Sequence, residues 1–435
     1  MALGGGTFSV QNKEIPGTYI NFVSAASANA SLSGRGIVTM PLTMDWGVEG
    51  EVIEVTSEDF ADDCMRIFGY PLSHEKMKGL RDLFRNTHVL YAYRLNGGGA
   101  KAANDYAEAL YSGIRGNDLK IIIQKNVDDD KMFDVKTMLG MNVVDEQTVA
   151  GAADLVSNEY VKFKADAELE ITASMPLTGG TNGEVSGTSH QDYLDKIEAY
   201  SYNAMGIEAL SEEVKTLYCA FAKRMREEMG VKFQVVLYCK DADYYGVVNL
   251  VNKVNDTGWD EAALVYWVTG VIGGCEVNKS NQNRVYDGEF DVDTSYTQAQ
   301  LRKSVKNGEF VLHKVGTEIR VLADINSMVT ESTEHNSVFK ENQTIRVIDQ
   351  IANDIAVLFN TKYLGVVPND NAGRISLWSD IVKHHKQLNE IRAIEDFSDS
   401  DVVVMQGEGK KSVVVTDRVT VVNAMDKLYM TVTVE

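Results

Sequence analysis

The stretch 211–238, SEEVKTLYCAFAKRMREEMGVKFQVVLY, joins a helix pattern directly to a strand pattern. Apolar side chains recur at helical spacing from Val214 onward, Ser211 is suited to cap the first turn, and Gly230 is suited to end the helix. The apolar run Phe233–Tyr238 then follows at once, as in a strand that is buried on both faces. This order predicts an α/β protein whose core is a mostly parallel sheet covered by helices on both faces.

The same rhythm of strands and helices extends to both sides of this stretch. Alternating or continuous apolar runs between turn residues favour strands, and apolar stripes behind a capping residue favour helices. On this basis we predict strands at 36–42, 50–57 and 88–95, helices at 58–68, 73–85, 245–254 and 260–272, and a hairpin at 309–322.

Two regions depart from this rhythm. Between residues 97 and 175, short strands separated by polar turns recur at a spacing of about ten residues, which is typical of a small β-sandwich. After residue 336 the pattern predicts an α+β domain with two amphipathic helices, one capped by Thr344 and the other by Ser376.

Both ends of the chain resemble β-strands that belong to no compact domain. Residues 417–435 contain two alternating β-branched runs around a turn at 423–426, and the first twenty residues end in a short extended motif. Unpaired strand edges are satisfied when another chain supplies a partner strand. We therefore expect inter-subunit strand arms, with the contacting side chains Ile15, Thr18, Tyr19 and Ile20 at one end and Val419, Val421, Leu428, Met430, Val432 and Val434 at the other.

These patterns divide the chain into six predicted segments. They are an N-terminal arm (1–22), the first part of the α/β core (23–96), an inserted β-sandwich domain (97–175), the main α/β core (176–335), a C-terminal domain (336–416) and a C-terminal strand arm (417–435).

Composition limits the possible functions. A net charge of −21 would repel a polyanion, so we expect no nucleic-acid partner. The four cysteines form no Cys-x-x-Cys pair, which favours a reducing compartment. The sequence has neither a secretory leader pattern nor a run of about eighteen apolar residues. We expect a protein made in a bacterial cytoplasm and not inserted in a membrane.

No motif predicts a catalytic, cofactor or metal site. Residues 97–102 fit a glycine-rich phosphate turn, but a strand pattern rather than a second βα unit follows. Residues 407–412 resemble the end of a P-loop but lack its first glycine and lie between two strands. The adjacent His384 and His385 cannot share a metal as i, i+4 partners would, and we interpret them as surface residues.

A local group of basic residues stands out in this acidic chain. Lys383, Lys386 and Arg392 lie on or near the predicted helix 376–394. A solvated helix face explains them simply, and a docking face for an acidic partner is the functional alternative.

Five short motifs follow one another along almost the whole chain. They are Pro16-Gly17-x-Tyr19, Gly113-x-x-Gly116-Asn117-x-Leu119, the loop 177–183, the segment 323–328 and the helix entry 338–346. Taken in order, these motifs resemble the tail sheath proteins of contractile phage tails and phage-tail-like bacteriocins, especially those of Gram-positive prophages. No Trp-Gly-Ala-Arg stretch, common in the C-terminal domain of classical myophage sheaths, is present.

The resemblance implies a structural subunit that polymerises as stacked hexameric rings around an inner tube and contracts to drive the tube through a cell envelope. It implies as partners other copies of the chain, the inner tail tube protein, and baseplate and tail terminator proteins, within a virion or tail-like particle released on lysis. It also implies that Lys383, Lys386 and Arg392 face the tube. No cofactor is expected, since assembly itself would supply the energy of contraction.

Two other functions remain open at this point. One is a nucleotide-dependent α/β enzyme that uses the loop 97–102 or 178–183. The other is a capsid-like shell protein, which would also be acidic and carry arms.

Overall fold

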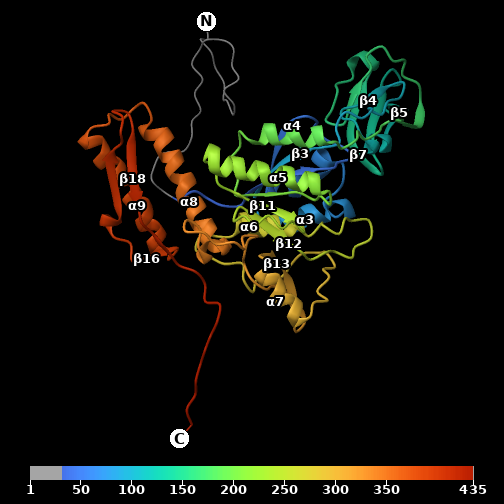
Figure 1. Cartoon of the computed structure of the whole chain (residues 1–435). Coiled ribbons are helices and arrows are strands. Elements are labelled where there is room, and N and C mark those ends of the chain that lie inside the picture. Colours follow the sequence, from blue (N-terminus) through green and yellow to red (C-terminus); the bar gives the residue numbers. More distant parts are fainter. Residues whose placement is uncertain (1–31, 435) are drawn as a thin grey trace.

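A seven-stranded, mostly parallel sheet forms the centre of the computed structural model, which describes residues 32–434 (Figure 1). The strand order is β13-β12-β11-β10-β1-β3-β2, and only β2 runs antiparallel to its neighbour. The strands are β1 (Ile37–Leu42), β2 (Val52–Thr56), β3 (Val89–Arg94), β10 (Ala204–Gly206), β11 (Gln234–Tyr238), β12 (Val247–Leu250) and β13 (Glu309–Phe310).

Both faces of this sheet are buried, as the sequence predicts. In β11, Val236 and Tyr238 join one hydrophobic cluster, while Val235 and Leu237 join the cluster on the other face. One face carries α1 (Ser57–Asp62), α2 (Cys64–Phe68), α3 (Lys78–Phe84) and α6 (Val265–Gly274), and the other carries α4 (Gly187–Ile197) and α5 (Glu212–Arg224). Figure 1 shows α5 and α6 on opposite sides of β11. The α/β class is confirmed.

Several element predictions in the core are wrong. The helix predicted at 245–254 is absent, and this stretch contains the buried strand β12 (Val247–Leu250) instead. A short apolar run has no periodicity that distinguishes a strand from a helix. The helix predicted at 260–272 begins only at Val265. The first residues of the predicted hairpin, Glu309–Phe310, belong to the core sheet as β13. The hairpin itself consists of β14 (Leu312–Val315) and β15 (Glu318–Val321). Helix α7 (Gln298–Lys306) precedes it.

The inserted region is all β, with a four-stranded sheet β7-β6-β5-β9 and a two-stranded sheet β4-β8. Trp46, which follows β1, is fully buried in this region and lies against Tyr111 and Tyr160, so the domain is packed onto the core as well as joined to it. Its strands are β4 (Ala107–Ala109), β5 (Leu119–Lys125), β6 (Phe133–Leu139), β7 (Asn142–Val149), β8 (Val161–Phe163) and β9 (Thr172–Pro176).

The C-terminal domain lies on the opposite side of the core from the inserted domain (Figure 1). Its helices are α8 (Asn342–Leu358) and α9 (Asn371–Glu390), and its strands are β16 (Ile394–Glu395), β17 (Val402–Gln406), β18 (Val413–Asp417) and β19 (Thr420–Val421). Both predicted helix caps are wrong. Thr344 and Ser376 lie inside their helices, since α8 starts after Glu341 and α9 is capped by Asp370, whose carboxylate accepts from the Gly373 N–H at 2.8 Å.

Candidate assembly surfaces

The C-terminal segment leaves the domain from a fixed root. Strand β19 pairs with β16 through Ile394 and Val421, and the Val422 N–H donates to the Ala393 carbonyl at 3.0 Å. The buried side chain of Gln343 in α8 donates to the Val422 carbonyl at 3.1 Å and accepts from the Ala424 N–H at 2.9 Å. The direction in which the segment departs is therefore set by α8 and β16.

Beyond this root the segment runs away from the body of the molecule (Figure 1). Residues 422–434 belong to no strand in the described chain. Six large apolar side chains of these residues are exposed. Four of them stand at alternate positions: Leu428 (85%), Met430 (74%), Val432 (69%) and Val434 (89%). Exposed apolar residues at alternate positions favour a strand that is completed by another chain.

Two predicted arm residues lie elsewhere. Val419 and Val421 are half-buried and pack with Leu388 and Ile394 in the chain's own C-terminal domain. The predicted contact residues of the other arm, Ile15, Thr18, Tyr19 and Ile20, lie outside the described residues.

On helix α9, the predicted tube-facing lysines lie on the exposed face, and the two histidines beside them lie on the buried face. Lys383 and Lys386 are exposed one turn apart, and the Lys386 ammonium lies 2.8 Å from the carboxylate of Asp399. Arg392 is also exposed, but it follows the end of the helix in a left-handed conformation with φ of 62°.

The interpretation of His384 and His385 as surface residues is wrong. Both are buried, with exposed fractions of 1% and 0%. Their ring nitrogens lie near two carboxylates, His384 Nε2 at 3.0 Å from Asp354 and His385 Nε2 at 2.7 Å from Asp417. The buried face of α9 is wider than its apolar residues indicate, because these two polar side chains have partners on α8 and β18.

Buried ion pairs, which sequence reasoning missed, fasten α8 to the core. The Arg226 guanidinium makes two hydrogen bonds to the Asp349 carboxylate, at 2.7 and 2.6 Å, and the two side chains are 1% and 8% exposed. Burial alone would lower the pKa of Arg226, but the adjacent Asp349 charge outweighs it and the pKa lies above its ordinary value. Arg346 lies 3.3 Å from Asp324, and both are 1% exposed. In the sequence, the two charged residues Arg346 and Asp349 next to the apolar stripe of this helix could have indicated buried ion pairs.

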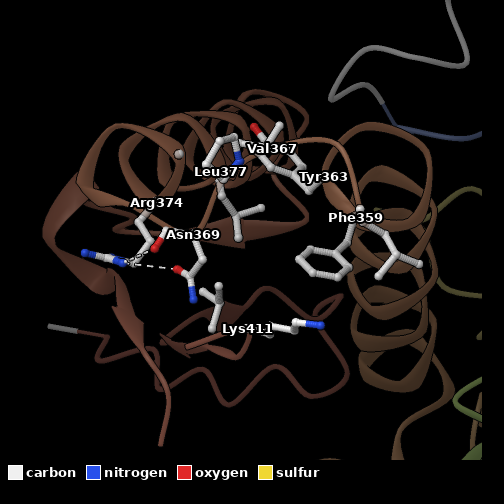
Figure 2. Close-up of a pocket in the computed structure, with 12 residues that line it drawn as sticks. Phe359, Tyr363, Val367, Asn369, Arg374, Leu377 and Lys411 are labelled. Atoms are coloured by element: carbon white, nitrogen blue, oxygen red, sulfur yellow. Dashed lines mark hydrogen bonds between the residues drawn. The ribbon is translucent and has the colours of Figure 1, made fainter. Parts of the chain in front are cut away.

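A small cavity of about 90 Å³ lies where the end of α8, the start of α9 and the β17–β18 turn meet (Figure 2). The Arg374 guanidinium donates to the backbone and side-chain oxygens of Asn369, both at 3.1 Å. The Asn369 amide in turn donates to the carbonyls of Lys410 and Ser412. Residues 407–412 thus form the turn between two strands, and their interactions serve to hold that turn against α9.

The glycine-rich turn at 97–102 has no free cradle for a phosphate. The Gly98 N–H donates to the Glu49 carboxylate at 2.7 Å, and the Ala100 N–H donates to the Thr181 hydroxyl at 3.0 Å. A carboxylate of the chain therefore occupies the place that a phosphate would need. Strand β4, not a helix, follows this turn.

A cleft of about 670 Å³ lies at the carboxyl ends of β1 and β10, where parallel sheets often bind ligands. The carboxylate of Asp45, on the wall of this cleft, forms an ion pair with Lys76 and accepts hydrogen bonds from Tyr70 and Asn182. Burial raises the pKa of Glu208, another lining residue, to about 7.

Within residues 32–434, no group of three His, Cys, Asp or Glu side chains could hold a metal ion. No helix of this part is long and apolar enough to cross a membrane.

An α/β core that carries an all-β insertion, a packed C-terminal domain and an exposed apolar tail defines a structural subunit that assembles with other chains. Four family models match successive parts of the sequence. They describe the domain III N-terminal region of a tail sheath protein (35–95), and the β-sandwich (96–182), central (183–327) and C-terminal (334–435) domains of phage tail sheath proteins.

Similar proteins agree with these models. The chain is 29% identical to the phage-like element PBSX protein XkdK of Bacillus subtilis over 99% of this chain and 100% of that one. A sheath tail protein from Desulfitobacterium hafniense is similar with a TM-score of 0.83 and 32% identity, over 95% of this chain and 99% of that one. The contracted helical sheath of the anti-feeding prophage shares the fold, with a TM-score of 0.54 and 13% identity over 97% of this chain and 99% of that one.

The chain belongs to the phage tail sheath protein family. It is a structural subunit of a phage tail sheath and not an enzyme. The family resemblance seen in the sequence is confirmed, and the enzyme and shell alternatives are set aside.

Proposed function

We propose that this subunit polymerises as hexameric rings stacked around an inner tail tube, and that the rings contract to drive the tube through a cell envelope. The observation that carries this proposal is the C-terminal segment. Its root is held by β16 and Gln343, while the apolar side chains of 428–434 have no cover within the described chain. Strand donation to a neighbouring subunit would bury these side chains and pair their backbone.

The C-terminal domain also offers edges that a neighbour's strand could join. Sheets β16–β19 and β17–β18 have only two strands each in the described chain. Val403, Met405 and Val414, on the face of β17–β18 turned away from α9, are between 43% and 51% exposed. The six segments proposed from the sequence would then be two arms (1–22 and 417–435) and four intervening segments that form the body. The root of the C-terminal arm, through Ala424, stays on the chain's own domain, and the part beyond it would link subunits.

Main-chain pairing between arms suits an assembly that changes shape. Hydrogen bonds along a strand do not depend on how the compact domains touch, so rings could rotate and slide while the arms keep them joined.

We propose the inner tube, the baseplate and the tail terminator as the other partners. The protein would be made in the bacterial cytoplasm and released on lysis within a phage tail or tail-like particle.

Negative-stain electron microscopy of the concentrated, purified protein tests the proposal. We expect hollow cylinders of uniform width, because subunits with complementary arms can polymerise without other proteins. A template of tube protein is added in a parallel sample, since the tube could be needed for nucleation. Only small closed oligomers or spherical shells in both samples would contradict the proposal.

We further propose that Lys383, Lys386 and Arg392 face acidic residues of the tube in the extended sheath. Exposed ion pairs contribute only about 0–1 kcal/mol each, which suits contacts that must break when contraction begins. Lys386 already pairs with Asp399, so a tube carboxylate would compete with, or join, this existing pair.

Reversing the charge at Lys383 and Lys386 (both to Glu) should give sheaths that are contracted or lack the tube. The fold should persist, because both side chains are exposed. The measurement is electron microscopy of sheath and tube proteins assembled together. Lys410→Glu with Lys411→Glu makes the same change of charge at the exposed β17–β18 turn and should leave extended, tube-filled particles. Normal extended particles from the first variant would refute tube contact at α9.

A further inference from the structure

A pair of buried histidines lies where α8, α9 and β18 meet. His384 Nδ1 and His385 Nδ1 are 3.2 Å apart, and the opposite nitrogen of each ring lies near a carboxylate, Asp354 for His384 and Asp417 for His385. The result is a continuous chain of four side chains: carboxylate, imidazole, imidazole, carboxylate.

The carboxylates fix two of the protons in this chain. Asp354 accepts from the Ser33 hydroxyl at 2.5 Å and from the Gln350 amide at 2.8 Å. Burial opposes the charge of Asp354, but hydrogen bonds from His384, Ser33 and Gln350 outweigh burial and hold its pKa below the usual range. An ionised carboxylate can only accept, so His384 Nε2 carries a proton. The 2.7 Å contact with Asp417 requires the same of His385 Nε2.

The contact between the two Nδ1 atoms then fixes the proton count. With no proton there, two nitrogen lone pairs would face each other at 3.2 Å, and with two protons, two N–H groups would do so. Only one shared proton makes this contact a hydrogen bond. The complete network therefore holds one imidazolium and one neutral imidazole between two carboxylates, which is favourable for a buried cation.

The network joins the segment before β1 to the root of the C-terminal arm. Ser33 lies at the start of the described chain, and its hydroxyl and N–H both donate to Asp354. Asp417 is the last residue of β18, three residues before β19 begins. Through the two histidines, the network thus connects a residue just before β1 to the strand that leads into the C-terminal arm.

We propose that His384 and His385 are positioning residues that fix the departure of the C-terminal arm, and that they do so while the pair holds one shared proton. This inference rests on the proposed strand donation. Arg35, ahead of β1, interacts with the charge of Asp354. Arg418 follows Asp417 directly, and Asp380 lies one turn before His384 on α9. Phe397, from the segment after β16, lies against His385 and adds no charge. The remaining charges of α9 nearby, Lys383 and Lys386, are exposed.

Hydrogen exchange on the unassembled protein tests the positioning role. In the wild type, amides 418–422 should be protected at neutral pH. Asp417→Asn should speed their exchange about tenfold, because it removes a charged acceptor from the network. Asp399→Asn, a matched change at an exposed ion pair of the same domain, should behave as the wild type.

Nitrogen NMR of histidine-labelled wild type tests the proton count without any substitution. The expected spectrum at neutral pH has one doubly protonated ring and one singly protonated ring, or their average. Two singly protonated rings, or exchange of 418–422 that Asp417→Asn leaves unchanged, would overturn the inference. Both measurements use monomer, so their failure is separate from a failure of the wild type to form cylinders, which would overturn strand donation instead.

Discussion

Deletion of residues 428–435 should abolish polymerisation while leaving a folded monomer. The described side chains of this segment are exposed, and none takes part in a hydrogen bond or ion pair to the body of the protein. We therefore expect the free energy of unfolding to change by less than about 0.5 kcal/mol. A neighbour would lose both the main-chain pairing and the burial of four apolar side chains, each worth about 1.5–3 kcal/mol when fully buried.

Thermal unfolding, size-exclusion chromatography and electron microscopy together measure this result. A single substitution tests whether polymerisation needs the backbone hydrogen bonds of this segment or only its presence. Val432→Pro removes an N–H from the middle of the segment and should act like the deletion, since proline cannot donate within a sheet ladder. Val432→Ala keeps the N–H and should still polymerise at higher protein concentration. Cylinders formed by the truncated protein would refute strand donation by this arm.

The elements that the sequence predicted correctly are those with a long and regular pattern. Helix α5 begins after the Ser211 cap, and the stretch 233–238 contains the central strand β11, because many apolar positions agree there. The apolar run in 247–250 was too short to separate a strand from a helix. Thr344 and Ser376 are reasonable caps by residue type, but Glu341 and Asp370 precede them and begin the helices earlier.

The candidate surfaces were predictable to the extent that they depend on the local chain. The alternation of apolar and polar residues in the C-terminal segment could be recognised in the sequence, because it depends only on neighbouring residues. The buried histidines were not, since their burial depends on Asp354 and Asp417, about thirty residues away on either side. The pairing of Arg226 with Asp349 spans 123 residues, so the charged residues beside the apolar stripe of α8 could suggest a buried ion pair but could not identify the partner.

This ion pair gives the last and largest expected effect on stability. Asp349→Ala should lower the free energy of unfolding by about 3–5 kcal/mol, because it leaves the buried Arg226 guanidinium without a counter-charge. The first transition should be loss of the α8 contacts, seen as faster exchange at 342–358. Glu198→Ala is the matched control: it breaks the pair with Arg224, whose side chains are 30% and 40% exposed, and should cost no more than about 1 kcal/mol.

A double substitution separates the cost of an unpaired charge from the value of the pair itself. Arg226→Met with Asp349→Leu removes both charges and should restore most of the stability that Asp349→Ala loses. If the double variant is as unstable as the single one, packing and not charge explains the effect. If Asp349→Ala is no worse than Glu198→Ala, the pair does not hold the domain. Strong docking here would make core and C-terminal domain move as one body, leaving the arms to accommodate the contraction.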